Sequence, residues 1–189
     1  MNDQRGAGPK ITNGVNVTEL GEVAQELGRR PELGAFRFRV QNEWSGEGGL
    51  SASAVEPFHG LGQEQQHRED HHMVADEPEA LLGEDRGANP VEHLLGALAS
   101  CLTGAMVYHA AARGIELRRV ASRVEGDLDV RGFMGVTPGV PKGYQRIAVE
   151  FEVDADATPE QLRQLAEFSP VLNTLRDGVP IELRIHTRG

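Results

Sequence analysis

The residue with the clearest chemical potential is Cys101, the only cysteine among the 189 residues. A thiol reacts as its thiolate, so a nearby cation, a metal or a helix N-terminus must lower its pKa. Cys101 lies near the middle of the mainly apolar and small-residue run NPVEHLLGALASCLTGAMVYHAAARG, residues 89–114. A cysteine in such a run is either a small packing residue or a reactive group placed in a buried helix. The sequence around Cys101 leaves both interpretations open.

No charged residue lies one helical turn from Cys101, on either side. The thiol is also twelve residues beyond Asn89, the expected start of the helix, where the helix dipole has little effect. An activating arginine must therefore arrive from another element or another subunit. The candidates that the sequence offers, without choosing among them, are Arg37, Arg39, Arg146 and Arg176.

Three other ionisable residues share this run with Cys101. Glu92 follows Asn89 by three residues, the spacing of a carboxylate that caps a helix, and we favour this role over that of a base. His93 and His109 lie eight residues on either side of Cys101, about 80° away around a helix, so neither stacks on the thiol. A cysteine–histidine nucleophilic pair within this helix is therefore not expected. The signatures GxSxG, P-loop and GxGxxG do not occur.

Residues 63–86 carry eight acidic residues together with His67, His71 and His72. Imidazoles and carboxylates close in sequence could form a metal site, but the segment has neither an HExxH motif nor cysteine–histidine spacing. The alternative is a solvated loop with one strand near His71–Ala75. We prefer the loop, and we predict neither a bound metal nor any other cofactor.

The charge and the composition of the chain argue against several classes of protein. The chain has 29 acidic against 19 basic residues, a net charge of −10, which disfavours general binding to nucleic acid or to anionic membranes. A single cysteine cannot form an internal disulfide, and MNDQRGAGPK lacks the apolar run of a secretory signal. No uninterrupted apolar stretch reaches the roughly 18–20 residues of a membrane span. We therefore expect a cytoplasmic protein that binds neither nucleic acid nor membrane.

The cysteine run predicts a helix with both ends marked. Asn89 suits the N-cap and Pro90 the first helical position, and Gly114 supplies the left-handed residue that ends it. From Pro90 to Arg113 the helix would be roughly 36 Å long. Because its middle is apolar or small, we expect burial on most sides.

The other segments predict helices and strands around this helix. An earlier helix is expected over 17–27, with Gly28 to stop it, and an alternating strand over 35–41 forms a hairpin with 50–58. Strands are expected over 118–130 and 145–153, joined by a loop over 132–143. Thr158 begins a helix whose inner face includes Leu162, Leu165, Ala166 and Phe168. Ser169 caps a shorter helix over 170–176. A strand over 179–186 is the last element of the chain. This order indicates an α+β fold with antiparallel sheet.

The run at 89–114, together with the later FSPVLNTLRDGVPIEL, resembles the OsmC/Ohr family of bacterial organic-hydroperoxide and osmotic-stress proteins. The resemblance covers about residues 35–189 and leaves 1–34 as an N-terminal extension, for which we expect a disordered start and a short helix. It implies antiparallel sheets packed around a long central cysteine-bearing helix. It also implies an intertwined homodimer with active sites at the subunit interface.

In the peroxidase members of that family one cysteine attacks the peroxide, a second closes a disulfide, and an arginine and a glutamate poise the thiolate. Cys101 matches the attacking cysteine, whereas the place of the second cysteine holds Ser169. Val91 stands at the position of the family's glutamate, and the nearest acid, Glu92, is one residue later. Glu92 is therefore a catalytic candidate only if an acid shifted by one residue can take over that role. The arginine is matched by Arg37 or Arg39.

Two functions follow from this resemblance. The first is a thiol-dependent reductase of organic hydroperoxides that uses Cys101, with an external thiol or dithiol in place of the second cysteine. The second is a protein that binds an apolar or thiol-reactive small molecule at the dimer interface without turnover. Val91 and Ser169 motivate the second, because they remove two chemical groups and leave the pocket's shape.

Overall fold

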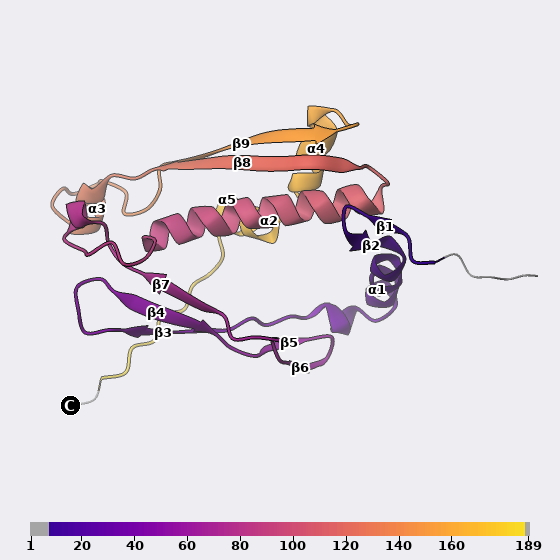
Figure 1. Ribbon diagram of the computed structural model, residues 1–189. Helices are drawn as coiled ribbons and strands as arrows, with labels where there is room; N and C mark the ends of the chain where they lie inside the picture. Colours follow the sequence, from indigo (N-terminus) through magenta and orange to yellow (C-terminus); the bar gives the residue numbers. More distant parts are fainter. Residues whose placement is uncertain (1–7, 188–189) are drawn as a thin grey trace, which may run out of the picture. The chain divides into compact units, whose positions relative to one another are not determined.

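In the computed structural model, which describes residues 8–187, the chain divides into two units, one ending at Gly96 and the other beginning at Ala97 (Figure 1). The first unit holds β1 (Ile11–Thr12), β2 (Val15–Asn16), α1 (Val17–Arg29), η1 (Pro31–Gly34), β3 (Val40–Trp44), β4 (Ser51–Val55), β5 (Phe58–Gly60), β6 (Gln63–Gln65), β7 (His72–Ala75), η2 (Glu79–Leu81) and the first turns of α2 (Pro90–Ala112). The second holds the rest of α2, β8 (Leu117–Asp127), α3 (Val130–Met134), β9 (Arg146–Ala155), α4 (Pro159–Ala166) and α5 (Pro170–Asp177). The predicted domain boundary after residue 34 stays a prediction.

Helix α1 begins where the sequence indicates and ends slightly later. The Asn16 side chain accepts the backbone N–H of Glu19 at 3.2 Å and caps the helix. Gly28, expected to stop α1, remains helical. The helix ends at Arg29 because Arg30 precedes Pro31 and leaves the helical conformation, with φ −130° and ψ 76°. Of the start that we predicted to be disordered, residues 1–7 lie outside the described part of the chain.

The predicted hairpin in the first unit is confirmed, although its strands are shifted. Strands β3 and β4 pair antiparallel, with Val40 opposite Val55 and Trp44 opposite Ser51, and β7 pairs with the other edge of β4. Regular pairing starts at Val40 rather than Ala35, and Arg37 forms only an isolated bridge with His59. The predicted 50–58 strand is interrupted before β5 because Pro57 has no N–H for the ladder.

The connection from β7 to α2 is ordered by Asp76, whose side chain is 2% exposed. Its carboxylate accepts the backbone N–H groups of Glu77, Glu84 and Arg86 at 2.8, 3.2 and 3.1 Å. These bonds, that to Arg86 first, lower the pKa of Asp76 from its ordinary value. The later part of residues 63–86, which we expected to be a solvated loop, is therefore folded around one buried carboxylate.

Helix α2 has the predicted ends. The Asn89 side chain accepts the N–H of Val91 at 2.9 Å, and Glu92 accepts the backbone N–H of Asn89 at 2.9 Å. At the other end Gly114 adopts φ 69°, and the N–H of Ile115 donates to the carbonyl of Ala110. The short capping side chains and the glycine thus account for both boundaries.

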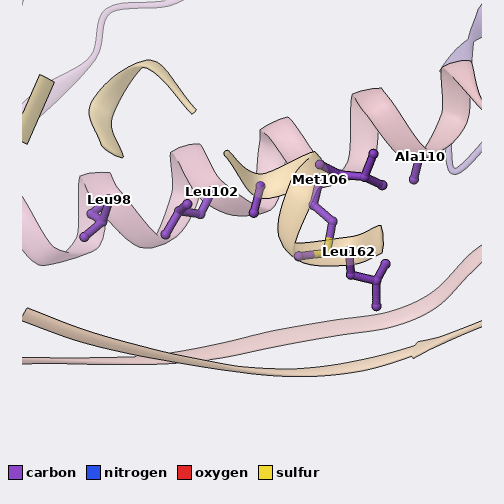
Figure 2. Close-up of a cluster of buried hydrophobic side chains, with 7 residues drawn as sticks. Leu98, Leu102, Met106, Ala110 and Leu162 are labelled. Carbon is purple, nitrogen blue, oxygen red and sulfur yellow. The ribbon is translucent and has the colours of Figure 1, made fainter. Parts of the chain in front are cut away.

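Burial of α2 differs from the expectation. The helix buries one stripe, spaced mostly four residues apart, rather than most of its surface (Figure 2). That stripe consists of Leu98, Leu102, Met106, Ala110 and Ala111. By length and composition alone α2 is also apolar enough to cross a membrane, but the core helix of a water-soluble domain has the same character, so the expected absence of a membrane partner stays a prediction.

The second unit places α2 beside the antiparallel β8–β9 pair, with α4 near one end of the hairpin and α3 near the other (Figure 1). Part-buried Val120, Val149 and Phe151 pack against the buried stripe of α2. Strand β8 ends at Asp127, three residues earlier than predicted, since Asp129 caps the unpredicted helix α3.

Helices α4 and α5 follow the predicted caps. The Thr158 hydroxyl accepts the N–H of Gln161, whose side chain accepts the N–H of Thr158, so the capping box is complete. Leu162, Leu165 and Ala166 are buried as predicted, and Leu162 approaches Met106 in Figure 2. Phe168 was assigned to the same face, but it is 53% exposed and its ring stacks on His109.

The predicted C-terminal strand is not formed. From Gly178 to Thr187 the chain pairs with no strand of the described residues. Its apolar side chains are 56–88% exposed: Val179, Ile181, Leu183 and Ile185. The alternating pattern was read correctly, but a strand needs a partner, and residues 8–187 provide none for this segment.

Candidate functional site

Cys101 is half-buried on α2, between Leu98 and Leu102 of the buried stripe. Among residues 8–187 no group hydrogen-bonds to its Sγ. No cation within the second unit contacts the thiol, so this unit by itself does not supply the charge that would hold a thiolate. That the activating cation comes from another element or another subunit stays a prediction.

The two arginines favoured by resemblance lie in the first unit. Arg39 is half-buried and its guanidinium binds Glu64 through two N–O contacts of 2.9 and 3.3 Å. It also donates to the carbonyl of Pro57 at 2.9 Å, and the hydrogen bond to Glu64 raises the pKa of Arg39. Arg37 is held through its backbone by His59. Arg39 is thus already positioned by a carboxylate, whereas no ion pair is seen for the Arg37 side chain among the described residues.

The other two arginine candidates lie in the second unit with partners of their own. Arg146 contacts Asp127 at 3.2 Å. Arg176 donates to the side chain of Asn173 and lies 3.6 Å from Asp177. Neither arginine is bound to Cys101, so the structure gives no reason to prefer either as the activator.

Glu92 and Ser169 both have structural roles here. Glu92 is engaged by the backbone N–H of Asn89 and lies nine positions before Cys101 on α2, about half a turn around the helix. Ser169 is fully buried, and its Oγ accepts the N–H of Leu172 at 3.1 Å to begin α5. The position that resemblance assigns to a second cysteine is therefore used as a helix cap.

The three histidines of residues 63–86 do not gather in one place. The rings of His67 and His71 lie 5.3 Å apart, and His67 also packs on Phe58 at 5.2 Å. His72 instead belongs to β7, opposite Ala54. Within residues 8–187 no group of three or more potential metal ligands is found, so these side chains do not form the metal site considered from the sequence.

The second unit contains a pocket that sequence reasoning did not identify. Its volume is about 500 Å³, within the usual range for small-molecule sites. Its apolar walls come from Leu102 and Met106 of α2, Phe151 of β9 and Leu172 of α5. The pocket is also lined by a charged residue, Arg176. Four elements separated in sequence, α2, β9, α4 and α5, form these walls, so only the apolar positions of each element were visible beforehand.

Comparison with known proteins identifies the family. A family model described as OsmC-like protein matches residues 83–184, which include α2 with Cys101 and the segments around Ser169. The chain belongs to the OsmC-like family. No curated protein matches it.

Solved structures of OsmC-like proteins share this fold. One from Mycoplasma pneumoniae has a TM-score of 0.55 and 16% identity, over 75% of this chain and 89% of that one. An OsmC-like protein of unknown function from Vibrio cholerae has a TM-score of 0.53 and 12% identity, over 73% and 92%. A putative osmotic stress induced and detoxification response protein from Psychrobacter arcticus has a TM-score of 0.52 and 12% identity, over 71% and 85%. The predicted α+β fold around a cysteine-bearing helix is thereby confirmed.

Proposed function

We propose that this OsmC-like protein is a thiol-dependent reductase of organic hydroperoxides, with Cys101 as the nucleophile. The observation that carries the proposal is a single, half-buried cysteine in the middle of the long helix of an OsmC-like fold. A fully buried structural thiol would be inert, whereas Cys101 is partly exposed, as a thiol that meets a small substrate must be. The protein works in the cytoplasm and needs no metal or other cofactor for this chemistry.

The reaction balances with one protein thiol and two external ones. The Cys101 thiolate attacks the distal oxygen of the hydroperoxide, the O–O bond breaks, and the alkoxide takes a proton and leaves as the alcohol. The resulting sulfenic acid condenses with an external thiol, which releases water and forms a mixed disulfide. A second external thiol restores Cys101 and leaves as the external disulfide. An external partner is required because the chain contains no other cysteine.

We further propose that the catalytic unit is a homodimer in which Arg37 or Arg39 approaches Cys101. The lack of a cation at the thiol among residues 97–187 supports a contribution from another element or another copy. Arg39 is the better positioned of the two, since Glu64 and the Pro57 carbonyl fix its guanidinium. As a guanidinium, Arg39 is also charged at any physiological pH.

The test is the loss of an organic hydroperoxide in the presence of a dithiol, comparing the native chain with Cys101→Ser. We expect activity only in the native chain, with one oxygen atom gained by Cys101 when the thiol is omitted. Arg37→Lys and Arg39→Lys then identify the activator, with Glu64→Gln as the control that releases Arg39 without removing it. Equal peroxide loss by the native chain and Cys101→Ser would overturn the proposal.

A second candidate is binding of an apolar small molecule without turnover. The pocket of about 500 Å³ favours it, because its walls are largely aliphatic and aromatic. Leu172→Trp should fill this space and weaken binding of a fluorescent apolar probe, whereas Val136→Trp, at a position 69% exposed and outside the pocket, should leave binding unchanged. If the native chain does not bind the probe, this candidate is rejected.

A further inference from the structure

We infer that the pocket of the second unit binds a carboxylate with a long alkyl chain, the chain lying between α2, β9 and α4 and the carboxylate on Arg176. The inference rests on the second function proposed above, binding without turnover, and names the class of ligand. It gives the protein a noncovalent ligand whose binding does not need Cys101.

The pocket continues into a second cavity of about 320 Å³. The two cavities share Val149 of β9 and both Leu172 and Arg176 of α5, so they meet between this strand and this helix. Along β9 the second cavity begins at Ile147 and the first reaches Val153. These are alternate positions on one face of the strand, and they extend over roughly 20 Å. The combined space is therefore elongated, which suits an alkyl chain better than a compact ring.

Helix α2 provides an apolar wall along the same length. Leu98 lines the second cavity, and Leu102 and Met106 line the first. Because these residues are four positions apart, they form one row on the helix, and Figure 2 labels them along it. Leu162 of α4 adds a further apolar side chain to the first cavity. A ligand in this space thus meets aliphatic side chains for most of its length.

Most of the charge around the two cavities is already neutralised. Glu167 and Arg163 line the first cavity, but they form an ion pair with each other, and Arg163 also contacts Glu160 at 2.7 Å. Arg146 borders the second cavity, but it precedes Ile147 on β9, so its side chain lies on the opposite face of the strand, where it contacts Asp127 at 3.2 Å. Arg176 is the remaining charged residue that lines the cavities.

Arg176 is placed to bind an anion where the cavities meet. It shares one face of α5 with Leu172 and Leu175, which are four positions and one position earlier. Its guanidinium donates to the neutral side chain of Asn173, and its ion pair with Asp177 is 3.6 Å long between two exposed side chains. Such a pair contributes little, so a ligand can replace it. A single guanidinium fork matches one carboxylate, which favours a singly charged head group.

The site is separate from the thiol. Among the described residues that line the two cavities, Leu102 is the immediate neighbour of Cys101 in the chain, but Cys101 itself lines neither cavity. The side chain that would hold the alkyl chain and the side chain that would attack a peroxide therefore lie in different environments. The carboxylate ligand needs no peroxide group, and its binding can be measured without any reaction at Cys101.

The experiment compares ligands that share one alkyl chain and differ in charge. Isothermal titration calorimetry on the full native chain measures decanoate, decanol and decylamine below the concentrations at which they form micelles. Because the hydrogen bonds to Arg176 are charge-assisted, we expect decanoate to bind at least about tenfold more tightly than decanol. Decylamine, a cation, should bind more weakly than decanol. Tighter binding of decyl phosphate than of decanoate would overturn the assignment of a singly charged head group.

Variants then locate the two ends of the ligand. Arg176→Gln should bring decanoate and decanol within about twofold of each other, and Arg176→Lys should restore part of the preference. Arg119→Gln is the matched control, because Arg119 is 62% exposed, pairs with Glu152 outside both cavities and carries the same charge. It should keep the native preference. Leu172→Trp should weaken decanoate and decanol by a similar factor, and unchanged binding would overturn the placement of the alkyl chain.

The outcomes separate this inference from the function on which it rests. Equal binding of decanoate and decanol to the native chain would overturn recognition of the carboxylate and leave binding of apolar molecules in place. If neither ligand binds, both are overturned. Cys101→Ser should bind decanoate as the native chain does, and loss of binding in this variant would overturn the separation of the site from the thiol.

Discussion

Ser169 and Leu172 are joined by a hydrogen bond in which the Ser169 Oγ accepts the Leu172 N–H at 3.1 Å. Ser169 is fully buried, so no water can replace that bond. The residue that stands where the peroxidase relatives are expected to hold a second cysteine is thus a helix cap with a defined energetic role.

We expect Ser169→Ala to destabilise the protein by about 1 kcal/mol, because the part-buried Leu172 N–H loses its acceptor. Ser169→Cys should lose a similar amount, since sulfur is a weak acceptor. Chemical denaturation monitored by circular dichroism measures the free energy of unfolding. Ser169→Thr, which keeps the hydroxyl, is the control for the cap, and a native-like Ser169→Ala would show that the bond contributes little.

Glu92 tests whether the displaced acid has a chemical role. We expect Glu92→Gln to keep both stability and the rate of Cys101 oxidation, because an amide oxygen can still accept the N–H of Asn89. Glu92→Ala should cost about 0.5–1 kcal/mol of stability through loss of the cap. Stopped-flow measurement of Cys101 oxidation by a hydroperoxide provides the rate; a tenfold slower Glu92→Gln would assign the carboxylate to the chemistry.

Leu82 is held in an unfavourable backbone conformation. Its φ is 67°, in the left-handed region that L-residues avoid, and it is 92% exposed. Leu82→Gly should raise the free energy of unfolding by about 0.5–1 kcal/mol, the relief of strain being partly offset by the greater freedom of glycine in the unfolded chain. Leu82→Ala is the matched control, because it removes the same exposed side chain but retains Cβ. It should not raise the melting temperature, which is measured by thermal unfolding of both variants.

The buried carboxylate of Asp76 should make the stability of the β7–α2 connection sensitive to acid. Its folded-state pKa lies below the ordinary value of 3.8, chiefly because it accepts the Arg86 N–H. The carboxylate therefore contributes stability that is present above the unfolded-state pKa and is lost as the pH falls through the folded-state pKa. Melting temperature measured from pH 7 to 2.5 should fall most steeply below pH 4 in the native chain. Asp76→Asn should be less stable at pH 7 and show a shallower acid dependence; parallel curves would contradict the assignment.

Local sequence signals determined several elements without tertiary information. The ends of α2 are set by Asn89, Glu92 and Gly114, because each capping interaction joins residues that are only a few positions apart. The Thr158 cap of α4 and the Ser169 cap of α5 follow for the same reason. Strands β8 and β9 were also visible, since alternation records which side of a strand faces a core.

Tertiary structure decided what depends on partners distant in sequence. Glu64 binds Arg39, 25 residues earlier in the chain, and four separate elements line the pocket in the second unit. It also left the alternating segment 179–186 unpaired, although its pattern is that of a strand. Alternation specifies a face to be buried, but a strand forms only where another backbone meets its N–H and C=O groups, and that depends on the arrangement of the whole chain.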